Sequence, residues 1–103
     1  MHIVHSVNKI PIRIPKERWD HVVLGHPEMD RYQSEVLDTL GNPDYIFEGS
    51  SGEKIAVKDY LSNLGKLIVV VYKELNQEDG FLVTSFLISK LNRVEKKKLI
   101  WKK

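Results

Sequence analysis

Two histidines in the first third of the chain, His21 and His26, are the side chains best suited to acid–base chemistry. An imidazole gains or loses a proton near neutral pH, so either residue could act as a general base or a general acid. Lys58 and Tyr60 stand two residues apart and would share one face of a strand. A lysine ammonium can stabilise the charge that develops on a phosphate during its transfer. With Thr84, a hydroxyl in an otherwise apolar segment, these residues form the candidate catalytic set.

Each candidate also has an interpretation without chemistry. His21 is equally consistent with an ordinary exposed residue. His26 stands directly before Pro27 and could serve the second helix through its backbone alone. Thr84 is a good strand former that fits many places in a sheet. The sequence therefore leaves the role of each side chain open.

No metal or cofactor site is predicted from the other polar residues. A helical metal pair needs ligands four residues apart, whereas His21 and His26 are five apart with an expected helix end at Gly25 between them. His2 and His5 belong to a segment without a clear pattern. The chain has no cysteine, no Gly-rich phosphate loop and no nucleophile elbow. We expect a site that works without a metal ion or a cofactor.

Basic residues crowd the C-terminal end, although the net charge of the chain is only +2. A basic end can attract phosphate backbones without sequence preference. Charge alone favours the simpler interpretation, a solvated terminus that keeps the protein in solution. For a nucleic-acid-binding domain, the residues expected to contact the phosphates are Arg13, Lys96, Lys97, Lys98 and Lys102.

The 103 residues predict one domain that spans the whole chain, 1–103. The hydrophobic and charged fractions, 42% and 29%, are typical of a globular protein. A cysteine-free chain of this size fits a reducing compartment. The longest strongly apolar run, Leu67 to Tyr72, is too short to cross a bilayer. We therefore expect a cytoplasmic protein that has no membrane partner.

Two short helices should position the histidines. The spacing of Trp19 and Val22 predicts a helix over 16–24 with one apolar stripe. His21 falls about 160° from Trp19 on the helical wheel, so it should point away from that stripe. A second helix is predicted over 27–40, ended by the sequence Gly-Asn-Pro.

The remaining segments have the period of strands, and they predict an α+β fold of two short N-terminal helices packed on a four- to five-stranded antiparallel sheet. Pro11 cannot donate to a ladder, so the first strand should be an edge strand or an extended arm. Residues 1–7 carry no decisive pattern and are expected to be loosely held. Residues 98–101 fit either a last strand or a helical turn. The expected strands are 10–14, 44–49, 54–61, 67–72 and 81–88, the last two forming a central hairpin around the polar turn 74–80.

Five short segments follow one another in a recognisable order: Arg18-Trp19-Asp20-His21, His26-Pro27-Glu28-Met29, Asn42-Pro43-Asp44-Tyr45-Ile46, Val69-Val70-Val71 and Val83-Thr84-Ser85-Phe86. Their order resembles the phage-associated barnase–EndoU–colicin–RelE-like (BECR-fold) nuclease families, from about Ile10 to Trp101. The resemblance implies N-terminal helices followed by an antiparallel sheet. It also implies a metal-independent ribonuclease, often a toxin, that acts from the sheet face. By position, His21 and His26 match the helix-region histidines of the family, and Thr84 matches its strand hydroxyl residue.

The resemblance and the polar residues together predict RNA cleavage. A histidine would take the proton of a ribose 2′-hydroxyl, which attacks the phosphorus and leaves a 2′,3′-cyclic phosphate. A second acid would protonate the leaving 5′-oxygen, and Lys58 or Arg13 would stabilise the phosphate oxygens. Two alternatives stay open: a non-catalytic nucleic-acid-binding domain, and a protein-interaction module of a phage or toxin–antitoxin system. RNA is the expected partner, and a toxin-like role would add an inhibitor or antitoxin protein.

Overall fold

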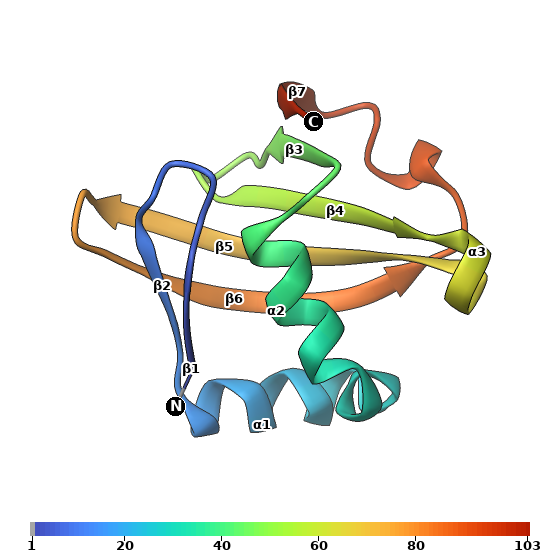
Figure 1. The fold of residues 1–103 in the computed structure, drawn as a ribbon, viewed down its shortest axis with the longest axis horizontal. Helices are drawn as coiled ribbons and strands as arrows, with labels where there is room; N and C mark the ends of the chain where they lie inside the picture. The colour runs from blue at the N-terminus through green and yellow to red at the C-terminus, as the bar shows by residue number, and fades with distance from the viewer. Residues whose placement is uncertain (1) are drawn as a thin grey trace.

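A computed structural model describes residues 2–103, and its centre is a mixed β-sheet with helices on one face (Figure 1). Within these residues the sheet has seven strands in the order β1-β2-β6-β5-β4-β3-β7. The expected α+β class is right, but the expected sheet of four or five antiparallel strands is wrong. Two of the additional strands come from segments at the two ends of the chain, and β2 pairs with β6 in parallel.

The middle of the sheet is the long hairpin of β5 (Lys66–Asn76) and β6 (Asp79–Ile88). Its apolar residues bury side chains on both faces, as expected for central strands. Both strands extend beyond the apolar runs 67–72 and 81–88. The polar segment 74–80, expected as a turn, is therefore mostly strand. Gly80 marks the place where β2 joins, because a Cβ there would lie 2.5 Å from the carbonyl oxygen of Lys73 and 2.6 Å from Cδ1 of Ile12.

Strands β3 (Tyr45–Glu48) and β4 (Lys54–Tyr60) form the second expected hairpin beside β5. Beyond β3 lies β7 (Lys98–Lys102), which pairs antiparallel with it and settles the choice between strand and helical turn at 98–101. A single helical turn, α3 (Leu61–Leu64), links β4 to β5.

The N-terminal segment is a hairpin of β1 (His2–His5) and β2 (Pro11–Ile14), which corrects two expectations. Residues 2–5 are paired in the sheet, and β2 lies between β1 and β6 rather than at an edge. Burial explains the placement, because Ile12 and Ile14 are at most 1% exposed, and a strand with a neighbour on each side exposes less than an edge strand. The turn of the hairpin is held to β5 by the Ser6 hydroxyl, which donates to Oε2 of Glu74 at 2.6 Å.

The helices are α1 (Lys16–Gly25), the 3₁₀ helix η1 (Pro27–Tyr32), and α2 (Gln33–Gly41). Trp19 and Val22 of α1 are buried, which confirms the predicted stripe. The second expected helix therefore starts as a 3₁₀ segment and becomes an α-helix only at Gln33. Among residues 2–103, no helix is both long and apolar enough to span a bilayer.

The sheet buries apolar side chains on both faces, and different parts of the chain cover them. Helix α2 covers the face that carries Ala56, Ile68 and Val70, which we call the helix face (Figure 1). The opposite face, the back face, carries Val57 and Val69 and is covered by the connection between β6 and β7. We call this connection, residues 89–97, the strap. It includes the 3₁₀ helix η2 (Leu91–Arg93), and its residue Val94 is buried in the back-face core.

Candidate functional site

Helix α1 lies alongside β6 and runs in the same direction (Figure 1). This arrangement brings four side chains together in two pairs. The guanidinium carbon of Arg18 lies 6.0 Å from the centre of the Phe81 ring. Two helical turns later, the His26 ring lies 5.7 Å from the Phe86 ring, centre to centre, at an angle of 32°. These two contacts fix the helix along the length of the strand.

The register of β6 against β5 places three of its side chains on the back face. Phe81 lies opposite Lys73, Thr84 opposite Val71, and Phe86 opposite Val69. Residues opposite one another in a ladder point to the same side, and the odd-numbered β5 partners all point to the back face. Phe81 and Thr84 are three residues apart and would point to opposite faces of a regular strand. The register shift at Val71 and Tyr72 is a bulge, and it lets Phe81 point to the same face as Thr84 and Phe86.

All three β6 side chains are half-buried, so the strap leaves this part of the back face partly open. We call the five side chains Arg18, His26, Phe81, Thr84 and Phe86 the β6 surface. The neighbouring Ser85 points the other way, since its buried hydroxyl donates to the carbonyl oxygen of Val69 at 2.7 Å. The two adjacent hydroxyls therefore have different surroundings, and only Thr84 shares a face with Phe86.

His26 stands at the junction of α1 and η1, where its backbone serves both elements. Its N–H donates to the carbonyl of Val22, and its own carbonyl accepts from the N–H of Met29. The side chain is left free for other contacts and is 40% exposed. Its Nδ1 lies 3.7 Å from Oε2 of Glu28, which is near this carboxylate but beyond hydrogen-bond distance. The junction thus presents a histidine–carboxylate pair beside the Phe86 ring.

Lys58 and Tyr60 lie on the helix face, on the far side of the sheet from Thr84. Both bind the same carboxylate on α2: Nζ of Lys58 lies 2.8 Å from Oδ2 of Asp38, and the Tyr60 hydroxyl donates to that oxygen at 2.5 Å. They share a strand face as expected. The sheet nevertheless separates them from the β6 surface, so the five expected catalytic residues do not meet in one cleft.

Burial and hydrogen bonds shift the pKa values of two groups in this cluster, Asp38 and Tyr60. Burial alone would raise the pKa of Asp38, but the hydrogen bonds from Lys58 and Tyr60 and the lysine charge outweigh it and lower that pKa below its ordinary value. Burial, and then the hydrogen bond to the charged Asp38, raise the pKa of Tyr60 above its ordinary value. The cluster is therefore an ionised Asp–Lys pair with a neutral tyrosine, which ties α2 to β4.

His21 is exposed on α1, on the side away from the buried Trp19, as the helical wheel predicts. It stands three residues after Arg18, and side chains at that spacing are neighbours on a helix surface. His21 therefore lies next to the β6 surface without a contact to Thr84.

Arg13, expected to contact phosphate, is engaged by a carboxylate. Its Nε lies 2.7 Å from Oδ1 of Asp79, and its NH2 donates to Oδ2 of the same residue at 3.2 Å. The hydrogen bond and the arginine charge outweigh burial and lower the pKa of Asp79. This two-point pair neutralises much of the Arg13 charge.

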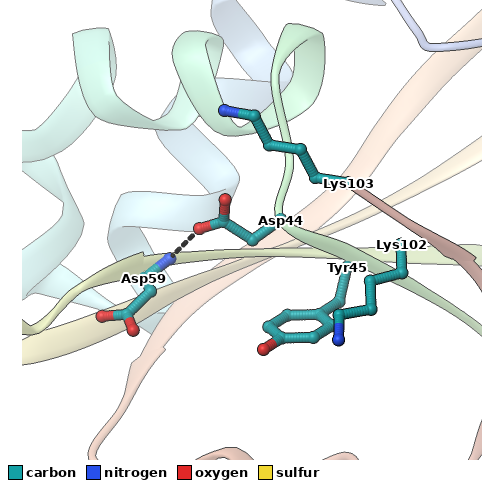
Figure 2. A pocket seen from close by; sticks show the side chains of 5 residues that line it. All are labelled: Asp44, Tyr45, Asp59, Lys102 and Lys103. Carbon is teal, nitrogen blue, oxygen red and sulfur yellow. Dashed lines mark hydrogen bonds between the residues drawn. The ribbon is translucent and has the colours of Figure 1, made fainter.

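The C-terminal lysines are dispersed on the strap and β7, and each of them is exposed. Nζ of Lys102 lies 5.9 Å from the centre of the Tyr45 ring, in a shallow pocket of about 320 Å³ (Figure 2). Asp44 and Asp59 also line this pocket, and the Asp59 N–H donates to Oδ2 of Asp44 at 2.8 Å. Two carboxylates beside the lysines make this pocket a poor binding site for phosphate.

The structure thus places His26 of the expected set against Phe86, two residues along β6 from Thr84 on the same face, while His21 is exposed on α1. It adds residues to which the sequence interpretation gave no role: Arg18, Glu28, Phe81 and Phe86. A signal for two of them was present, because Arg18 and Glu28 belong to the two histidine-containing segments. Among residues 2–103, no three His, Cys, Asp or Glu side chains gather in a group that could hold a metal ion.

Comparison of this chain with protein-family models, with curated proteins and with solved structures found no match.

Proposed function

We propose that this protein is a ribonuclease that binds RNA on the β6 surface and cleaves it without a metal ion. One observation carries the proposal: the His26–Glu28 pair lies beside a partly open sheet face that also displays the Thr84 hydroxyl and the Arg18 guanidinium. An imidazole, a hydroxyl and a cation are the groups that phosphodiester cleavage by a 2′-hydroxyl requires.

The two histidines have the acid–base roles in the proposed reaction. His26, which has Glu28 nearby, takes the proton of the 2′-hydroxyl, whose oxygen forms a bond to the phosphorus. The bond from phosphorus to the 5′-oxygen breaks, and that oxygen takes a proton from a second acid. His21 is the candidate for this acid, because it is the other imidazole on the same helix. The products are a 2′,3′-cyclic phosphate and a free 5′-hydroxyl.

Arg18 is the cation of the β6 surface that can contact the RNA, in place of Lys58 or Arg13. The Lys58 and Arg13 side chains are each paired with a carboxylate, and Lys58 is also on the other face of the sheet. Arg18 contacts an aromatic ring and stands on the side of α1 that faces Phe81. Its guanidinium can therefore bind a phosphate of the RNA at the Phe81 end of the β6 surface, about 13 Å along the strand from Phe86 and His26.

The basic strap extends the surface that RNA could contact. It starts at the end of β6, crosses the back face through the buried Val94, and ends at β7. Its exposed cations can bind phosphates on either side of the cleaved bond. We place the activity in the cytoplasm, because a chain without cysteine is suited to a reducing compartment. The cations in the strap and the adjoining β7 are Lys90, Arg93, Lys96, Lys97, Lys98 and Lys102.

The test is incubation of the purified protein with labelled RNA, with and without EDTA, followed by analysis of the cleaved ends. Cleavage that survives EDTA and leaves 2′,3′-cyclic phosphates is expected. His26→Ala should slow it by roughly 100- to 10,000-fold. His5→Ala is the matched control, since His5 is an exposed histidine on β1. Equal loss in both variants, or activity restored only by a divalent ion, contradicts the proposal.

Binding of RNA without cleavage is the second candidate function. It is favoured by the separation of Lys58 and Tyr60 from His26, which leaves the site with fewer polar groups than the sequence predicts. In this case the protein retains labelled RNA on a filter, leaves it intact, and binds it equally well after His26→Ala.

A further inference from the structure

A shallow groove of about 330 Å³ lies at the start of α1, next to the β6 surface. We infer that this groove holds an unpaired base of the RNA, so that the substrate is single-stranded. The inference rests on the proposed function and extends it to the substrate class. The residues that line the groove are Arg13, Pro15, Glu17, Arg18 and Phe81.

The charges around the groove favour a base inside it and a phosphate at its rim. Arg13 is already paired with Asp79, and the Glu17 carboxylate repels anions. An uncharged base avoids this repulsion and can lie against the Phe81 ring. Arg18 is the groove cation that remains available for the adjoining phosphate, and its guanidinium lies 6.0 Å from the Phe81 ring centre.

The two β6 aromatics are too far apart for neighbouring stacked bases to contact both of them. Phe81 and Phe86 are separated by about 13 Å along the strand, at roughly 3.3 Å for each step and one step lost to the bulge. Successive bases of a nucleic-acid helix are only about 3.4 Å apart and cover one another's faces. A base can offer its face to Phe81 only when it is unstacked and unpaired.

The position of the groove sets the order of contacts along the RNA. Thr84 lies between Phe81 and Phe86 on the same face, and His26 lies at Phe86. The base in the groove therefore belongs to a nucleotide next to the cleaved bond, on the Arg18 side. Recognition of this kind is tolerant of sequence, because every base has an aromatic face.

The experiment uses a 2′-O-methyl oligonucleotide that contains 2-aminopurine, whose fluorescence falls when the base stacks. The missing 2′-hydroxyl makes the probe uncleavable, so binding is measured without catalysis. A single-stranded probe and a hairpin with the same number of phosphates are compared. Tighter binding of the single strand, with quenching, is expected; equal affinity for the hairpin overturns the inference.

Two variants locate the stacked base. Phe81→Leu keeps an apolar side chain but removes the ring face, and should weaken binding of the single strand by about 5- to 150-fold. Arg18→Gln should weaken it as well. Arg31→Gln is the control, since Arg31 also lies over a ring, at 5.8 Å from the centre of Tyr32, on η1. Unchanged affinity in Phe81→Leu overturns the inference, and thermal unfolding of each variant verifies that it is folded.

The same measurements separate this inference from the proposed function. If RNA is not cleaved but the fluorescence of the 2-aminopurine probe is still quenched in a way that depends on Phe81, the proposed ribonuclease activity is wrong and the single-strand site remains. Metal-free cleavage that proceeds at the full rate in Phe81→Leu, with unchanged probe affinity, would keep the activity and remove the groove as a base site.

Discussion

At the scale of single residues, the Lys58–Asp38–Tyr60 cluster is a structural element rather than part of the β6 surface. Asp38 has a lowered pKa, so its charged form stabilises the folded state above the ordinary carboxyl pKa of about 3.9. This stabilisation is lost as the pH falls through the lower, folded-state value.

Asp38→Asn should therefore lower the melting temperature at pH 7 and flatten its fall below about pH 4. Thermal unfolding across this range measures both effects. Asp30→Asn is the control, because Asp30 is an exposed carboxylate on η1. Parallel pH profiles for wild type and Asp38→Asn would show that the carboxylate contributes nothing through its charge.

A second prediction at this scale concerns Tyr72 in the helix-face core. Its hydroxyl is buried and has no hydrogen-bond partner among the described residues. A buried hydroxyl without a partner costs about 1–3 kcal/mol of desolvation, so Tyr72→Phe should raise the free energy of unfolding by about 1 kcal/mol or more. Urea unfolding gives the value. A loss of stability would mean that the hydroxyl is satisfied in solution.

At the scale of elements, the parallel pair of β2 and β6 depends on Gly80. A Cβ at this position would meet a backbone oxygen and the side chain of Ile12 within 2.6 Å. Gly80→Ala should therefore cost about 1–3 kcal/mol, since the backbone must shift to make room. Gly25→Ala is the matched control, because nothing lies within 4 Å of a Cβ there. Chemical unfolding of both variants tests the pair, and equal stability of the two would contradict the close approach.

The elements also show how much of the fold follows from local pattern. Helix α1 and the hairpins β3–β4 and β5–β6 lie where periodicity predicts them, because each is stabilised by contacts close in sequence. The β1–β2 hairpin was not predicted, and β2 was expected at an edge, because its place between β1 and β6 depends on pairing between Ile12 and Gly80, far apart in the chain. The same limit applies to the site: His26 and Thr84 were predicted singly, but their grouping with Arg18 follows from the packing of α1 along β6.

At the scale of the whole molecule, charge is divided between two regions. Residues 27–48, which include η1, α2 and β3, carry six acidic residues and one basic residue, whereas residues 89–103 carry seven basic residues and one acidic residue. The RNA ligand that we propose should therefore approach the side of the strap rather than the acidic segment.

The salt dependence of RNA affinity tests this approach. Each phosphate contact to a single strand contributes about 0.7 to the slope of log affinity against log salt concentration. Lys96→Gln with Lys97→Gln should flatten that slope by about one to two units. Lys9→Gln, an exposed lysine in the β1–β2 turn, is the control. An unchanged slope in the double variant would mean that these strap lysines are solvated and do not contact phosphates.

The parallel pairing of β2 with β6 also has a consequence for the timing of folding. Helix α1 follows β2 directly, so the position of Arg18 and His26 depends on a strand pair that cannot form until Gly80 and Phe81 are available. Pairing across so long a stretch of chain is a slow step in folding. On a ribosome, the β6 surface therefore assembles only after residue 86 has left the exit tunnel. In the ribonuclease that we propose, a chain that is still being synthesised would have no assembled site while the RNA that encodes it lies within reach.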